Sequence, residues 1–293
     1  MSFQKLTPYL FVLPFLAIMG FIFVGGITQA VLQSLGYLPV FGMYELTLRY
    51  YWQVFNDARF IDAIVYTLYI ALVSSLLSVV LGVAVALVVW KLRKEGNVSF
   101  TFYKTPIIMP HIVVVMLIFN IFFQTGILSR VAFAIGIISS PHQFPLIVLD
   151  RGGIGIILVY LYKQIPFVAI IVLASLRSLN SPFEQIAENL GASWFITFTK
   201  ITLPLLAPSI LSAFLISFAF AFGAFEVPFL LGSPARHTLP VLAHIDYTSP
   251  VHAARPPAMA LSVIISVISL TLIWLYLCMA KHLSKRGLEG GLF

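Results

Sequence analysis

Two ionisable side chains interrupt the long apolar runs of this sequence and are its first candidates for chemistry. Lys163 lies near the middle of the run 152–176, and Glu226 lies in the later part of the run 204–231. A charged group inside so apolar a segment is costly, and such residues are commonly functional. Three interpretations follow: the two side chains form an ion pair, Glu226 attracts a cation, or Lys163 receives an anionic group.

The sequence around Glu226 is unusual for a continuous helix. It reads Phe-Gly-Ala-Phe-Glu-Val-Pro-Phe-Leu-Leu-Gly, in which Gly223 and Pro228 weaken helical hydrogen bonding and free backbone carbonyls. We therefore expect a solute path that includes Glu226, Lys163, Phe225 and Pro228.

Other chemistry finds little support. The chain has no Gly-x4-Gly-Lys-Ser/Thr phosphate loop, so we expect no nucleotide hydrolysis by this polypeptide. Its single cysteine, Cys278, excludes a disulfide within the chain. We predict no metal site, since no histidines pair at ligand-like spacing. His111, beside Pro110, is interpreted as a helix-end residue.

The elements that must hold these residues are membrane helices. Of the 293 residues, 60% are hydrophobic and 9% are charged, against roughly 25% charged in an average soluble protein. We predict an all-α integral membrane protein with a single domain over 1–293. Its spans are expected at 8–36, 60–90, 105–126, 152–176, 204–231 and 257–281, each long enough to cross a bilayer. The first is interpreted as an anchor helix rather than a cleaved signal peptide, and 131–138 as a helix on the outer surface.

The basic residues indicate the orientation of these spans. Lys and Arg resist translocation, so segments rich in them stay inside. With both termini cytoplasmic, ten basic residues fall inside and six outside, and the cluster 91–94 after the second span is the strongest indication. The net charge of +7 is therefore attributed to the cytoplasmic face of the membrane rather than to nucleic-acid binding.

Small residues recur at helical spacing in the second span, at Ser74, Ser78, Gly82 and Ala86. Such a stripe either lets two helices approach closely or lines a polar path. We favour helix packing.

The inner loop 177–203 is not an ordinary polar loop. Ser181 and Glu184 form a capping box, with Pro182 at the first helical position. Gly191 can end that helix in the left-handed conformation, and Ser193 can cap a second one. Apolar residues at helical spacing give one face, which comprises Leu190, Trp194, Phe198 and Ile201. That face must be covered by the chain's own spans or by a soluble partner.

The run Leu190-Gly-Ala-Ser-x4-Phe-x2-Ile-Thr-Leu-Pro204 resembles the EAA loop of ABC importer permeases. The resemblance extends over nearly the whole chain and implies a type I importer permease fold. It implies that the loop docks into a cytoplasmic ATPase. The residues expected to couple are Glu184, Gln185, Ala187, Leu190, Gly191, Ala192, Phe198, Ile201, Leu203 and Pro204. The family's Glu-Ala-Ala triplet falls on 185–187, so Gln185 replaces its Glu, and Glu184 either substitutes for it or only closes the capping box.

The same resemblance implies the partners and the solute. An ATPase dimer would carry ATP and Mg, a second and related permease chain would complete the pore, and an external binding protein would deliver solute. No cofactor is expected on this chain. It would be a transport subunit rather than an enzyme, and it would lie in a bacterial-type inner membrane. The stretch at Glu226 is similar to spermidine/putrescine permeases, which makes a polyamine-like cation the first expectation. Ferric iron, an anion such as a phosphonate, and an ion-coupled secondary transporter are the alternatives.

Overall fold

The computed structural model describes residues 3–94, 105–179, 186–187 and 189–289. Within them the chain is helical, with one isolated β-bridge between Leu38 and Met43. Six described segments are long and apolar enough to cross a membrane: Phe11–Ser34, Ala58–Leu92, His111–Ala134, Ile154–Ser178, Trp194–Gly223 and His252–Cys278. The prediction of an all-helical chain with six membrane-length segments is therefore confirmed.

The chain divides into two compact units. The first unit comprises Met1–Ile61 and Leu239–Val267, and the second comprises Asp62–Thr238 and Ile268–Phe293. Helices α3 and α13 each contribute to both.

The first unit contains short elements between its long helices. These are α1 (Phe3–Ser34), a 3-10 turn at Pro39–Phe41, α2 (Arg49–Phe55), the start of α3 (Ala58–Lys94), α12 (Leu239–Thr248), a 3-10 turn at His252–Ala254 and the start of α13 (Arg255–Glu289). Arg59 pairs with Asp57 at 2.8 Å and with Asp246 at 3.1 Å, which ties α3 to α12. The ring of Phe41 stacks on His252, and the Arg255 guanidinium lies 4.8 Å from the centroid of the Phe41 ring.

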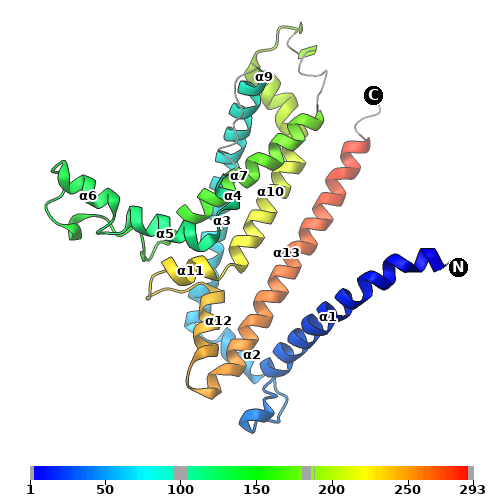
Figure 1. Ribbon diagram of the computed structural model, residues 1–293, viewed down its shortest axis with the longest axis vertical. Helices are drawn as coiled ribbons and strands as arrows, with labels where there is room; N and C mark the ends of the chain where they lie inside the picture. Colours follow the sequence, from blue (N-terminus) through cyan, green and yellow to red (C-terminus); the bar gives the residue numbers. More distant parts are fainter. Residues whose placement is uncertain (1–2, 95–104, 180–185, 188, 290–293) are drawn as a thin grey trace. The chain divides into compact units, whose positions relative to one another are not determined.

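The second unit is built around three helices that lie side by side in Figure 1. They are α3, α7 (Ile154–Leu179) and α10 (Leu203–Gly223). Their buried core consists of Ala86, Val89, Val168, Ala169, Val172, Leu173, Leu176, Leu206 and Ala213. The remaining elements are α4 (Thr105–Ile108), α5 (His111–Phe122), α6 (Ile127–Ala134), α9 (Trp194–Thr197), the π-helical turn Phe198–Thr202 and α11 (Glu226–Leu231), with a 3-10 turn at Pro141–Gln143.

The small-residue stripe of α3 packs against α7. Ser74, Ser78 and Ala86 are fully buried. A Cβ atom built on Gly82 would lie 2.6 Å from the Cβ of Val168, so only glycine permits this approach of the two helices. The interpretation of the stripe as a packing surface is confirmed.

Polar contacts connect the same three helices. The buried Gln164 of α7 accepts a hydrogen bond from Ser78 Oγ of α3 at 3.1 Å and donates to the Ser217 carbonyl of α10 at 3.2 Å. The hydroxyls of Ser175 and Ser209 lie 2.6 Å apart between α7 and α10. In an apolar medium such bonds fix the relative rotation of the helices.

Two predicted spans differ from the structure, and proline and glycine account for both. The predicted span 105–126 is broken at Met109 and Pro110 into α4 and α5, and the membrane-length segment is His111–Ala134. The predicted span 204–231 ends at Gly223, and α11 begins separately at Glu226. A helix is present where one was expected at 131–138: α6 begins four residues earlier at Ile127 and ends at Ala134. Its location on the outer surface stays a prediction, since α6 is also part of the membrane-length segment His111–Ala134.

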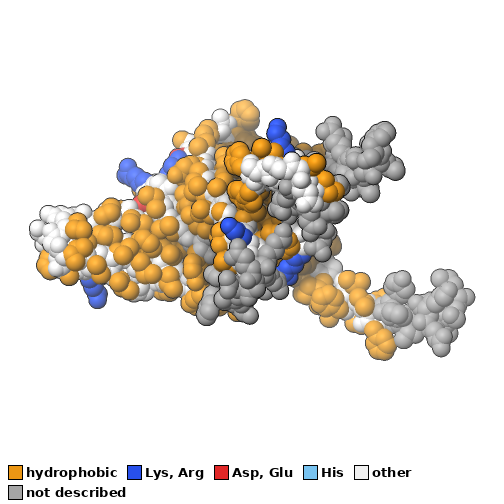
Figure 2. Space-filling model, turned by 90° about the horizontal axis from the view of Figure 1, so that it is seen from above, with side chains coloured by type: hydrophobic (Ala, Val, Ile, Leu, Met, Phe, Trp, Pro, Cys, Tyr) orange, Lys and Arg blue, Asp and Glu red, His pale blue; other side chains and the backbone are white. Residues whose placement is uncertain are grey.

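The outside of the described chain is strongly apolar. Figure 2 shows hydrophobic side chains over most of the visible described surface, with Lys and Arg scattered among them. Exposed Leu, Ile and Phe side chains in such numbers indicate a lipid-facing or partner-facing surface rather than an aqueous one.

Candidate functional site

The segment from Ile186 to Leu203 forms a compact turn between two short helical pieces. The Leu190 amide donates to the Ile186 carbonyl at 3.0 Å, and the Ala192 amide donates to the Ala187 carbonyl at 2.9 Å. Gly191 has φ +81°, the left-handed region that glycine adopts without strain. This hydrogen bond across a left-handed glycine is the Schellman arrangement, so the predicted role of Gly191 as a helix terminator is confirmed.

Ser193 lies at the N-cap of α9, with the extended backbone expected there, and its carbonyl accepts the Thr197 amide at 3.0 Å. Its hydroxyl makes no capping hydrogen bond. The predicted position of the cap is therefore confirmed, and the predicted side-chain contact is not formed.

Between α9 and α10 the chain makes a π-helical turn, Phe198–Thr202, in which the Leu203 amide donates to the Phe198 carbonyl. Pro204 explains this turn, since it has no amide hydrogen to donate to the Lys200 carbonyl. Such π-turns are frequent at functional sites. Pro204 is the sequence signal for this turn, whereas from the sequence alone it is expected to start a span and to be a coupling residue.

The apolar side chains of this segment, which we call the coupling patch, are exposed. Leu190 is 82% exposed, Trp194 67%, Phe195 68% and Ile196 52%. The Trp194 ring stacks on Phe198, with centroids 5.5 Å apart. The patch therefore presents an ordered apolar surface that the chain's own described helices leave uncovered.

The predicted coupling residues differ in how exposed their side chains are. Leu190 and Leu203 are exposed, Phe198 and Ile201 are half-buried, and Ala187 is buried beneath the turn. Ala192 and Pro204 stand at the two ends of the α9 region. Glu184, Gln185 and the capping Ser181 lie outside the described residues.

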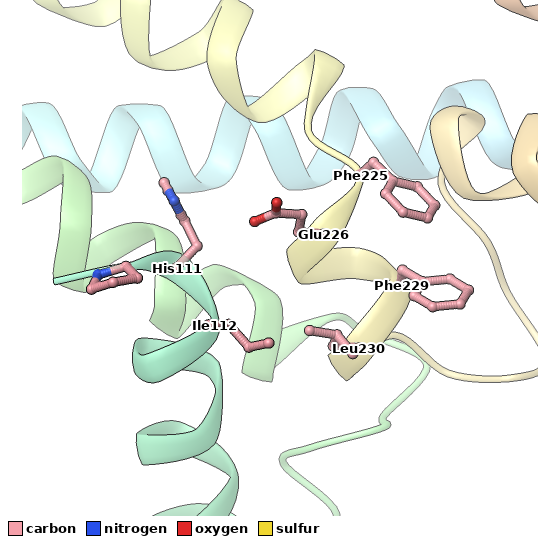
Figure 3. A pocket seen from close by; sticks show the side chains of 7 residues that line it. His111, Ile112, Phe225, Glu226, Phe229 and Leu230 are labelled. Atoms are coloured by element: carbon pink, nitrogen blue, oxygen red, sulfur yellow. The ribbon is translucent and has the colours of Figure 1, made fainter.

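A second candidate site is a pocket of about 480 Å³ between α5 and α11. Its lining residues are Pro110, His111, Ile112, Phe225, Glu226, Phe229 and Leu230. Figure 3 shows the Glu226 carboxylate directed across the pocket toward the side of His111. The rings of Phe225 and Phe229 lie on the other side of α11, stacked with centroids 5.0 Å apart.

The two helix breaks create this pocket. Gly223 ends α10, and Ala224 is extended, with φ −72° and ψ 135°, so that α11 can start in a new direction at Glu226. Opposite, Pro110 separates α4 from α5 and places His111 at the start of α5. The His111 ring stacks on Phe220 of α10, with centroids 5.4 Å apart.

The structure separates the predicted path residues. Glu226 and Phe225 line the pocket, whereas Pro228 is buried within α11 and is not among the lining residues. Lys163 points elsewhere: its ammonium donates to the carbonyls of Met109, at 2.6 Å, and Ile107, at 3.2 Å. The described contacts of Lys163 are therefore with backbone carbonyls and not with Glu226, which does not support the ion pair considered from the sequence.

His111 is one of five pocket residues that the sequence did not reveal, together with Pro110, Ile112, Phe229 and Leu230. It was interpreted as a residue at a helix end, and it does begin α5, but the break puts that end at the pocket. Pro110 was the available signal, because a proline inside an apolar run interrupts the helix and exposes the neighbouring residues.

This arrangement suits binding rather than catalysis. A carboxylate in a cavity with mostly apolar lining can hold a cationic group. Among the residues that the structure describes, no group of three or more His, Cys, Asp or Glu could hold a metal ion.

Taken together, a helical chain with six membrane-length segments, a pocket between broken helices and an exposed apolar turn define a membrane transport component. Residues 78–286 match the family model of the binding-protein-dependent transport system inner membrane component. The chain belongs to this family and is a multi-pass inner-membrane permease.

Individual relatives are more distant. The chain is 28% identical over 196 residues to the putrescine transport system permease protein PotI of Escherichia coli K12, an alignment that covers 66% of this chain and 64% of that protein. It is 26% identical over 196 residues to the sulfate transport system permease protein CysT of Salmonella typhimurium, covering 66% of this chain and 67% of the relative. The match thus spans just under two thirds of the length of PotI.

Among solved structures, a chain of a bacterial alginate ABC transporter, in complex with a periplasmic protein bound to an alginate pentasaccharide, has the same fold. The TM-score is 0.70 at 20% identity, covering 97% of this chain and 95% of that chain. At this identity the likeness concerns the fold.

Proposed function

We propose that this chain is a permease subunit of an ATP-driven importer and that the coupling patch is the surface on which a cytoplasmic ATPase docks. The carrying observation is the ordered, exposed apolar turn around Gly191, which places Leu190 and Trp194 outward at 82% and 67% exposure. Apolar side chains held out in this way on a rigid turn fit a cleft of a partner protein. Both termini and the loop 177–203 are then cytoplasmic.

In this proposal the ATPase dimer binds ATP and Mg, and two permease chains, this one and a related one, each present a loop to it. An external binding protein delivers solute at the opposite face. Closure of the ATPases moves the loops and turns the spans between inward- and outward-facing states. Family membership supports the need for a separate binding protein.

For the solute, the pocket at Glu226 supports a polyamine-like cation. Its one carboxylate is directed toward His111 across a cavity whose lining is mostly apolar, which suits an ammonium group on an aliphatic chain. The relative PotI is named for putrescine, in agreement with a cation. The relative CysT is named for sulfate, which makes an anion the second candidate. Glu226→Gln should reduce uptake of a cation and leave uptake of an anion unchanged or increased.

The docking proposal is tested by Trp194→Asp in the complete transporter. Because Trp194 is exposed, this change should leave the folded chain in the membrane while it removes the ATPase from the purified complex and abolishes ATP-dependent uptake. Val40→Asp is the matched control, since Val40 is 89% exposed in the first unit and lies outside the coupling patch. Normal ATPase retention and uptake by the Trp194 variant would contradict the proposal.

Gly191→Arg is a second variant with the same expected loss. A Cβ on Gly191 would meet nothing within 4 Å, so the new side chain has room within this chain, but a non-glycine residue at φ +81° strains the turn. Arginine therefore acts through this strain as well as through its bulk at the docking surface. Asparagine tolerates the left-handed conformation better than most residues, and Gly191→Asn should therefore preserve the turn and retain more ATPase than Gly191→Arg. ATP-independent uptake by the purified chain alone would instead favour an ion-coupled secondary transporter.

A further inference from the structure

The break between α4 and α5 leaves main-chain carbonyls without their helical donors. In an unbroken helix the amides of His111 and Val113 would donate to the carbonyls of Ile107 and Met109. Pro110 is instead extended, with φ −57° and ψ 146°, and the Val113 amide donates to the Pro110 carbonyl at 3.1 Å. Unpaired carbonyls are costly in an apolar membrane segment, so other donors are needed.

Lys163 supplies those donors from the neighbouring helix. Its ammonium lies 2.6 Å from the Met109 oxygen and 3.2 Å from the Ile107 oxygen, which uses two of its three N–H groups. The adjacent Tyr162 hydroxyl also donates to Met109, at its Sδ atom, 3.3 Å away. Since α7 is the most buried of the membrane-length segments, Lys163 anchors the break to the rigid part of the second unit.

The same break forms one wall of the pocket. Pro110, His111 and Ile112 follow Met109 directly and line the cavity opposite Glu226 (Figure 3). The position of His111 relative to Glu226 therefore depends on where the Met109 carbonyl is held.

We propose that Lys163 is a positioning residue of the Glu226 pocket and acts by donating hydrogen bonds to the carbonyls of the break, rather than by contacting solute. Its charge is compensated by two carbonyl dipoles, and its described contacts do not include Glu226. Of the two readouts that test this inference, the uptake measurement rests on the proposed transport function and the labelling measurement does not.

The first readout is uptake by the complete transporter with Lys163→Arg, Lys163→Gln and Lys163→Met. If donation to carbonyls is what matters, arginine should stay within ~3-fold of the wild type, and methionine, which has no donor, should lose ~10-fold or more. Glutamine is neutral but keeps two N–H donors, so it should fall between the two. Tyr162→Phe removes the hydroxyl contact to Met109 Sδ but spares both carbonyl contacts, so it should lose less uptake than Lys163→Met. Equal losses with glutamine and methionine would indicate a role for the charge itself and overturn the proposal.

The second readout does not need transport. Ile112 lines the pocket and is 53% exposed, so Ile112→Cys in a Cys278→Ala background can be labelled with a maleimide. Addition of Lys163→Met should change the labelling rate several-fold, while Lys163→Arg should not. Unchanged labelling together with unchanged uptake would refute the role of Lys163. Wild-type protein that shows no ATP-dependent uptake would count against the proposed function, and the labelling series would still decide the role of Lys163.

Discussion

Replacement of Gly82 by alanine tests the close approach of α3 and α7. The added Cβ would lie 2.6 Å from Val168 Cβ, 2.8 Å from Val168 Cγ1 and 2.9 Å from the Ile165 carbonyl oxygen. Carbon atoms in contact normally lie about 3.5–4.0 Å apart, so the helices must separate by about 1 Å. One of the three atoms is backbone, and another is a Cβ carbon that no rotamer change can move, so the strain cannot be relieved locally.

Two effects oppose each other in this variant. Overpacking of a tight core costs about 1–3 kcal/mol, whereas replacement of a helical glycine by alanine gains up to about 1 kcal/mol. We expect a net loss of about 1–2 kcal/mol because Gly82 and Val168 are both buried and the neighbouring core cannot shift freely.

The measurement is the free energy of unfolding in mixed micelles, followed by tryptophan fluorescence as SDS is added. Gly20→Ala in α1 is the matched control, since a Cβ there meets nothing within 4 Å. The control should be neutral or slightly stabilised. A Gly82→Ala chain as stable as the wild type would refute the argument for close helix packing.

Three further predictions concern other contacts. Arg236 pairs with Asp62 at 2.8 Å, so reversal of either charge alone should lower uptake. The double exchange of Arg236→Asp with Asp62→Arg should recover part of the lost uptake. No recovery would show that uptake does not depend on this ion pair. Gln164→Leu, which removes two inter-helix hydrogen bonds, should lower the unfolding free energy by about 1 kcal/mol, measured as for Gly82, and a gain in stability would contradict this. Burial raises the pKa of Asp57, but hydrogen bonds from Arg59 outweigh it and leave the pKa below its ordinary value. Asp57 therefore stabilises the fold above the unfolded pKa of about 3.9, and this stabilisation is lost as the pH falls through the pKa of the folded protein. In unfolding measurements at several pH values, the stability advantage of the wild type over Asp57→Asn should shrink below pH ~4. An advantage that grows below this pH would contradict the prediction.

The helical spans and the turn at Gly191 could be predicted because each depends on local sequence. Long apolar runs without charge favour membrane helices, and a glycine after an apolar helix favours a left-handed termination. The packing role of the stripe around Gly82 was also predictable, because small residues at helical spacing allow close approach in lipid.

The pocket could not be predicted because it depends on contacts between segments distant in sequence. Lys163 and Glu226 suggested chemistry because they are ionisable residues within predicted spans, yet Lys163 contacts carbonyls that lie 54 and 56 residues earlier in the chain. Whether a charge in a membrane helix pairs, caps carbonyls or meets solute depends on tertiary placement, which residue type and spacing do not specify. The π-helical turn before Pro204 is a similar case, since proline indicates a disturbed hydrogen bond but not how the chain accommodates it.

The proposed function depends most on the side of the membrane that the coupling patch faces and on what covers it. The direct measurement is maleimide labelling of Trp194→Cys, in a Cys278→Ala background, with a reagent that cannot cross the membrane. We predict labelling in inverted vesicles but not in intact cells, and protection in inverted vesicles when the ATPase is bound. Labelling from outside intact cells, or labelling in inverted vesicles that the ATPase does not reduce, would contradict the account.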